Sequence, residues 1–238
     1  MRDIGTVMWK EVSEFLGNAR VLRVFGLAVL IMGILPTLTV TRHQGSLALG
    51  PLLSLIEVFY VLFAAAIVVA QTAPDLVLHE RLGRTLDYLL ATRLPDTAIF
   101  GGKVLVGAAV GYVGALSAVV LQLCASAVLG GHGWSWLYLA LPAGRILAFG
   151  ATAALSVYVA VIGTFVALRV GDQRAAYMVT ILSLAVIAVP IPLGWITVSL
   201  TTAWFGHAVL VFGAVAVLLG LVGLRLFRRE MLVLYLQD

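Results

Sequence analysis

The sequence predicts an all-α integral membrane protein that forms a single transmembrane domain over residues 1–238. The composition supports this prediction, because 62% of the residues are hydrophobic and only 11% are charged, whereas soluble domains carry about 25% charged residues. The mean hydropathy of +1.11 agrees with it. No segment is long and polar enough to form a separate soluble domain. We therefore expect lipid, rather than water, to surround most of the chain.

Six apolar segments are long enough to cross a bilayer, because a spanning helix needs about 20 mostly apolar residues. These predicted spans cover residues 22–41, 52–74, 104–129, 146–168, 175–193 and 206–226. The charge-free stretch from Ala175 to Gly206 is too long for one upright helix, and Pro190 and Pro192 interrupt it. We predict a re-entrant or interfacial segment at residues 192–204, between the fifth and sixth spans.

The distribution of basic residues predicts the orientation of these spans. Of the 15 Lys and Arg residues, 13 fall on the side that carries both termini and the second-to-third and fourth-to-fifth connections. The positive-inside rule makes this side cytoplasmic. The net charge of +4 is then explained by topology and by attraction to anionic lipid, not by nucleic-acid binding. We predict a multi-pass protein of the plasma (inner) membrane with cytoplasmic termini.

Two short segments on the predicted cytoplasmic side have the pattern of amphipathic helices. In the first, Ile4, Met8, Val12 and Phe15 recur at helical spacing, which predicts a helix lying at the membrane surface. In the second, at residues 78–90, leucines form one face and charged residues the other. The leucines are Leu78, Leu82, Leu86, Leu89 and Leu90, and the charged residues are Glu80, Arg81, Arg84 and Asp87.

Three fragments of the sequence resemble permeases of the type-2 ATP-binding-cassette (ABC) exporters. The first is "WKEVSEFL" at residues 9–16, which is similar to the Lys-Glu start of the family's interfacial helix. The second is "ERLGRTLDYLLAT" at residues 80–92, which resembles the family's cytoplasmic signature. The third is "GK" at residues 102–103, which opens the third span. Two positions depart from the family pattern: Arg84 replaces a glycine, and Arg93 replaces a proline.

The resemblance implies that the chain is the membrane-spanning subunit of a transporter that exports a substrate across the plasma membrane. It also implies that the second-to-third connection is a coupling helix, which docks on a separate nucleotide-binding subunit. The implied docking residues are Glu80, Arg81, Arg84, Thr85 and Asp87, and the residues implied to pack this helix on the bundle are Leu82, Leu86 and Leu89. ATP and Mg would be bound by the partner, and a second permease copy or homologue would complete the transporter.

The sequence contains none of the common motifs of an enzyme active site. It has no Gly-x-x-x-x-Gly-Lys-Ser/Thr loop, so ATP would have to be bound and hydrolysed by another chain. It also lacks His-Glu-x-x-His and Gly-x-Ser-x-Gly. Because Cys124 is the only cysteine, neither an intrachain disulfide nor a cysteine-based metal cluster can form. We predict no catalytic residue, metal or cofactor in this chain.

The leading alternative is an ion-coupled secondary transporter or channel, with Glu57 as the coupling site. Glu57 lies only about six residues into the second span, where a carboxylate that reaches interfacial water is the simpler interpretation. Gln71 and Gln122 are the other polar candidates within the spans, and neutral glutamines more often join helices by hydrogen bonds. A structural membrane-assembly protein is a third alternative. The sequence identifies no transported substrate.

Overall fold

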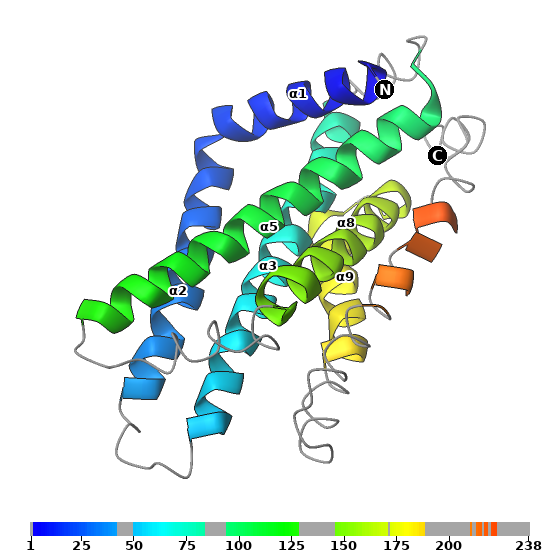
Figure 1. Ribbon diagram of the computed structural model, residues 1–238. Coiled ribbons are helices and arrows are strands. Elements are labelled where there is room, and N and C mark those ends of the chain that lie inside the picture. The colour runs from blue at the N-terminus through cyan, green and yellow to red at the C-terminus, as the bar shows by residue number, and fades with distance from the viewer. Residues whose placement is uncertain are drawn as a thin grey trace.

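A computed structural model describes residues 2–41, 50–83, 94–128, 146–170 and 172–188, and parts of 210–222. Within these residues the chain is helical and contains no strand, which confirms the all-α prediction for this part of the protein. The helices, shown in Figure 1, are α1 (Arg2–Gly17), α2 (Ala19–Thr41), α3 (Gly50–Leu82), α5 (Asp96–Val128), the π-helix η2 (Ile146–Ala151), α8 (Thr152–Arg169) and α9 (Gln173–Ala188).

Four of the described helices are long and apolar enough to cross a membrane. Their apolar parts are Val21–Leu38, Tyr60–Arg81, Asp96–Val128 and Phe149–Arg169, which correspond to the first four predicted spans. The fifth predicted span overlaps α9, which has 16 residues and begins two positions before the span. In the sixth, the residues described between 210 and 222 are helical. The segment at 192–204 lies outside the described residues, so six spans and the re-entrant segment stay predictions.

Two helices are longer than the spans predicted from the sequence. α3 continues to Leu82 with Pro74 inside it, although the predicted span ended there. Proline is tolerated within a spanning helix when a neighbouring helix packs around it, and a Cβ on Gly163 of α8 would lie 3.2 Å from Cδ of Pro74. α5 begins at Asp96 instead of position 104. Each of these 33-residue helices is about 50 Å long, so its end extends beyond a hydrocarbon core of about 30 Å.

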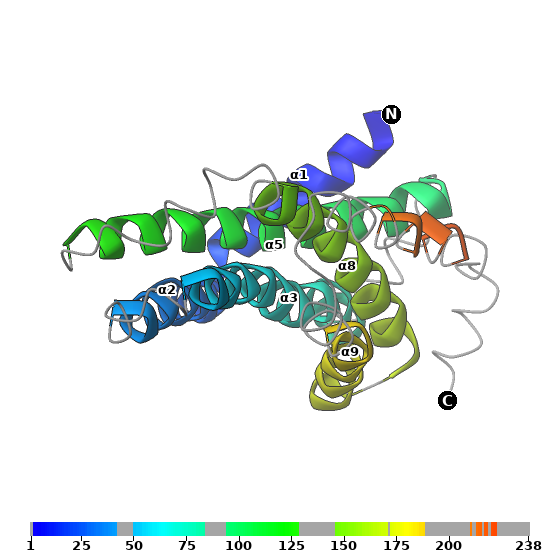
Figure 2. The same cartoon turned by 60° about the horizontal axis from the view of Figure 1, so that its bottom comes forward.

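α3 is the central helix of the described bundle and contacts α2, α5, α8 and α9 (Figures 1 and 2). Small residues allow these helices to approach closely. A Cβ on Gly111 of α5 would lie 1.8 Å from Cγ2 of Val69 on α3, and one on Gly107 would lie 3.3 Å from Cβ of Ala73. Since these glycines have no side chain to displace, the backbones of α5 and α3 pack directly against each other.

α1 lies across one end of the bundle, at a steep angle to α2 (Figure 1). Asn18 separates the two helices, and its Oδ1 accepts a 3.4 Å hydrogen bond from the N–H of Val21, which caps α2. The predicted N-terminal helix is confirmed, but its buried face is shifted from the predicted stripe. The most buried residues are Val7, at 2% exposed, and Glu11, at 1%, whereas Val12 is only half-buried. A carboxylate therefore takes a place that the pattern assigned to an apolar residue.

The charged residues of the described helices gather at the end of the bundle where α1 lies. Within the described part of the chain, Glu57 is the one Asp, Glu, Lys or Arg near the opposite end. This end brings together the start of α2, the end of α3, the start of α5 and the connection between α8 and α9. The sequence analysis placed the N-terminus and the second-to-third and fourth-to-fifth connections on one side of the membrane. In the structure, the described residues next to these segments do lie at one end of the bundle. Its assignment to the cytoplasm stays a prediction.

Candidate functional site

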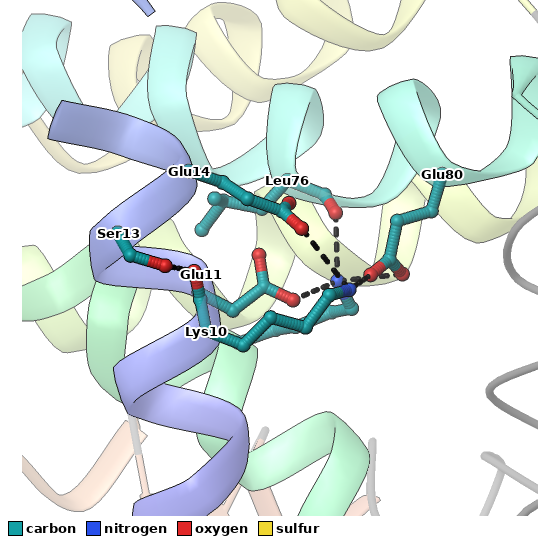
Figure 3. A network of polar contacts seen from close by, with 7 residues as sticks. Lys10, Glu11, Ser13, Glu14, Leu76 and Glu80 are labelled. Atoms are coloured by element: carbon teal, nitrogen blue, oxygen red, sulfur yellow. Dashed lines mark hydrogen bonds and ion pairs between the residues drawn. The ribbon is translucent and has the colours of Figure 1, made fainter. Parts of the chain in front are cut away.

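Five charged side chains from three helices meet at this end of the bundle (Figure 3). α1 supplies Lys10, Glu11 and Glu14, α3 supplies Glu80, and α5 supplies Lys103. We call these five residues the ion cluster. Its members come from segments far apart in the sequence, so the cluster fastens α1 to the two long helices.

Lys103 is the centre of the ion cluster. Its Nζ lies 2.6 Å from Oε1 of Glu11 and 2.8 Å from Oε2 of Glu80, and it donates a 2.7 Å hydrogen bond to the carbonyl oxygen of Leu76. The contacts with Glu11 and Leu76 are hydrogen bonds, and the contact with Glu80 is an ion pair. Lys103 and Glu80 are each 2% exposed and Glu11 is 1% exposed. Charges this deeply buried are tolerated only when they are paired and hydrogen-bonded, as these are.

Lys10 closes the cluster on its solvent-facing side. Its Nζ donates a hydrogen bond to Oε1 of Glu80 and lies 3.5 Å from Oε1 of Glu14. The Lys10 side chain is 37% exposed. Burial alone would lower the pKa of the Lys10 ammonium, but the Glu80 carboxylate outweighs this effect, and the pKa is raised. Glu80 therefore bridges the two lysines.

Glu11 is the least satisfied member of the cluster. Its Oε1 accepts a hydrogen bond from Lys103, whereas its Oε2 is buried without a hydrogen-bond partner among the described residues. Burial raises the pKa of the Glu11 carboxyl above its ordinary value, and the facing ammonium of Lys103 opposes this only in part. The ionised form of Glu11 thus depends on Lys103 to remain inside the protein.

The carboxylates of Glu11, Glu14 and Glu80 are close enough to suggest a cation site, since one oxygen from each lies within 4.8 Å of the others. Two ammonium groups already occupy this space and neutralise the carboxylates. A metal ion would have to displace Lys10 or Lys103 from those contacts. The arrangement favours a clamp between helices over a metal centre.

Gly102 allows α1 to come close enough to α5 for these ion pairs to form. A Cβ at position 102 would lie 2.7 Å from Cγ1 of Val7, which is itself buried in α1. A Cβ on the adjacent Gly101 would have no atom within 4 Å. In the fragment "GK", the glycine therefore removes the steric barrier to α1, and Lys103 supplies the charge that pairs with Glu11.

The structure corrects the interpretation of Glu80. The sequence pattern placed Glu80 on the exposed face of the coupling helix, but its side chain is buried and faces α1. The reason is that α3 continues through Glu80, which makes this residue part of the last packed turn of α3. Arg81 is partly exposed, and its buried Nη1 makes no hydrogen bond to the described residues.

The rest of the predicted docking surface is outside the part of the chain that the structure describes. These residues are Arg84, Thr85, Leu86, Asp87 and Leu89. For Leu82 the structure describes the helix but not the side chain. Docking of this connection on a partner therefore stays a prediction.

The polar residues within the spans have separate surroundings. Gln122 is fully buried, and its Nε2 donates a 3.4 Å hydrogen bond to the carbonyl oxygen of Met32, which joins α5 to α2 as expected for a neutral glutamine. Gln71 is partly buried and lines a cavity between α2, α3 and α9. Glu57 lies in α3, and its side chain is outside the described part of the structure.

The cavity beside Gln71 adjoins a second cavity that reaches the ion cluster. The first has a volume of about 290 Å³ and the second about 190 Å³. Asp75 and Gln173 line both, and they are joined by a hydrogen bond that the Gln173 Nε2 donates to Oδ1 of Asp75. We call the two adjoining spaces the α2–α9 cleft.

Comparison with known proteins adds no family assignment. No protein-family model matches the chain, and no curated protein matches it. The functional interpretation therefore rests on the residues of the chain and on the way the fold brings them together.

Proposed function

We propose that this chain is the membrane-spanning permease subunit of an ABC exporter. Its transport cycle would be driven by ATP that a separate nucleotide-binding subunit binds with Mg and hydrolyses. The supporting observation is the convergence of the three fragments that resemble this family. Lys10 and Glu11 from the first, Glu80 from the second and Lys103 from the third all belong to the ion cluster.

The position of the ion cluster suggests how force would reach the spans. Residues 83–95 connect α3 to α5, and Glu80 and Lys103 lie on the two sides of this connection. The ion pair between them holds the ends of α3 and α5 together, and Glu11 ties both to α1. A partner that pulls or pushes on this connection would therefore move three helices as one unit.

This mechanism needs a partner because the chain carries no nucleotide-binding motif of its own. Closure of the partner around ATP would favour one state of the bundle, and hydrolysis would favour the other. A second permease copy or homologue would supply the other half of the transport path. The charged end would face the cytoplasm in the plasma membrane, as the basic residues predict.

The test is to recover the full-length tagged chain from its native membranes in mild detergent and to identify the proteins that copurify. We expect a chain with a Gly-x-x-x-x-Gly-Lys-Ser/Thr loop in about equal amount, together with Mg-ATP hydrolysis. Substitution of the lysine in that loop should abolish hydrolysis while the two chains remain associated.

Absence of such an ATPase from intact, cross-linked membranes would contradict the proposal. Transport that continues without ATP, follows an ion gradient and is lost in Glu57→Gln would support the ion-coupled alternative instead. The control is the wild-type protein carried through the same purification without cross-linking, which separates stable association from trapping by the reagent.

A further inference from the structure

The α2–α9 cleft has the chemical character of a lipid site. Its first cavity is mainly apolar, with Val24, Phe25 and Val68 among its lining residues. Asp75 and Arg174 add one acidic and one basic side chain to the same lining. A ligand that matches this lining must carry an apolar portion, a cation and an anion.

The charges are separated along the cleft. Arg174 lines the first cavity but not the second, whereas Glu11 and Glu14 line the second but not the first. Asp75 lies where the two cavities meet. Because Lys10 pairs with Glu14 and Lys103 pairs with Glu11, Asp75 is the acidic group of the cleft that lies outside the ion cluster. Arg174 supplies a guanidinium to the first cavity.

Neither Asp75 nor Arg174 forms an ion pair within the described residues. Asp75 accepts its hydrogen bond from a neutral amide, that of Gln173. Arg174 donates its backbone N–H to Oδ1 of Asp172 at 3.3 Å, and its side chain is exposed. His79, one turn further along α3, attracts the Asp75 carboxylate but does not form an ion pair with it among the described residues. A ligand can therefore reach both charged groups from the cleft.

The cleft also lies at the depth where lipid headgroups are found. Val21, which lines both cavities, is the first residue of the apolar part of α2, and Asp75 lies near the end of the apolar part of α3. Deeper along the same helices, Leu27 of α2 is 60% exposed and Leu182 of α9 is 69% exposed. Apolar surface therefore continues from the cleft toward the middle of a bilayer.

We infer that the α2–α9 cleft binds the headgroup of an amine-bearing phospholipid, with phosphatidylethanolamine as the matching chemistry. The ammonium would lie against Asp75, where the two cavities meet, and Arg174 would hold the phosphate, for which its guanidinium is well suited. A cavity of about 290 Å³ is too small for a whole phospholipid, so the acyl chains would lie along the exposed faces of α2 and α9. This inference does not depend on the proposed transport function.

The test uses the full chain, purified in detergent, depleted of lipid and titrated with defined phospholipids while native mass spectrometry counts the bound molecules. We expect phosphatidylethanolamine to bind about tenfold more tightly than phosphatidylcholine or phosphatidylglycerol, since choline cannot donate a hydrogen bond and glycerol carries no cation. Asp75→Asn should remove the preference for ethanolamine over choline. Arg174→Gln should weaken binding of all three by about tenfold, and Arg174→Lys should restore part of it.

Asp96→Asn and Arg169→Gln are the matched controls, because both residues lie at the same end of the bundle but outside the cleft. Both controls should bind as the wild type does, and circular dichroism should show every variant folded. Equal dissociation constants for the three lipids, or an unchanged preference in folded Asp75→Asn, would overturn the inference. It would also be overturned if free phosphoethanolamine competed as strongly as the lipid, or if a second copy of the chain cross-linked across the cleft and excluded lipid.

Discussion

Lys103 and Glu11 are 92 positions apart in the sequence, and their charged groups lie 2.6 Å apart in the folded chain. Both side chains are almost completely buried. Removing one partner of such a pair strands the other charge, whereas removing both leaves no unpaired charge. Single and double substitutions of Lys103 and Glu11 should therefore differ in their effects on stability, and this difference can be measured.

Lys103→Met should destabilise the protein by about 3–5 kcal/mol, because Glu11 then loses its one salt bridge among the described residues and Leu76 loses a hydrogen-bond donor. Glu11→Gln should cost less, and the double variant should recover about 0.5–3 kcal/mol of the loss. Thermal unfolding in detergent measures all three. Arg23→Met is the control, because Arg23 is an exposed cation outside the cluster. Additive effects of the two substitutions would contradict the pairing.

The raised pKa of Glu11 predicts a dependence of stability on pH. Above its ordinary pKa of about 4.5, Glu11 holds its proton more strongly in the folded state than in the unfolded state. The contribution of Glu11 to stability should therefore fall as pH rises from that value through the folded pKa. Unfolding of the wild type and of Glu11→Gln, compared between about pH 4 and 8, isolates this contribution. If the free energy of unfolding of the wild type minus that of Glu11→Gln rose with pH, the result would contradict this prediction.

Gly102 and Gly101 offer a matched test of how α1 packs on α5. Gly102→Ala should cost about 1–3 kcal/mol, because its Cβ would meet Cγ1 of Val7 at 2.7 Å. Gly101→Ala should be neutral or slightly stabilising, since its Cβ meets nothing within 4 Å and alanine favours a helix. Val7→Ala should lessen the cost of Gly102→Ala. Equal effects at positions 101 and 102 would contradict the described approach of α1.

The sequence predicted the helices better than it predicted the site. The apolar segments identified α2, α3, α5 and α8 because each contains a long run of hydrocarbon side chains, which depends only on local composition. The predicted end of the second span at residue 74 and the predicted start of the third at residue 104 were wrong. Packing at the charged end continues α3 to Leu82 and starts α5 at Asp96, beyond their apolar runs.

Glu80 shows why the site was harder to predict. A charged residue on an amphipathic pattern is ordinarily exposed, and only the tertiary fold brings Lys10 and Lys103 against it. One signal was present: Lys103 is a cation within the opening turns of an apolar helix, and such a residue requires a buried anion. The pattern did not identify which carboxylate that would be.

The position of Glu80 also determines which substitutions can test docking. Reversing Glu80 would place a third positive charge beside Lys10 and Lys103 and disturb folding directly. Arg84 and Asp87 belong to the connection itself and are the better choice. Exchanging both charges, in Arg84→Glu with Asp87→Lys, should create like-charge contacts with a partner without disturbing the ion cluster.

Copurification of a nucleotide-binding subunit with this double variant tests the central claim most directly. The claim predicts that Arg84→Glu with Asp87→Lys remains folded and membrane-inserted but loses most of the associated ATPase, whereas the control Arg23→Glu retains it. Single exposed ion pairs contribute only about 0–1 kcal/mol, so both charges must be exchanged together. Wild-type amounts of ATPase bound to the folded double variant would contradict the claim that this connection is the docking site.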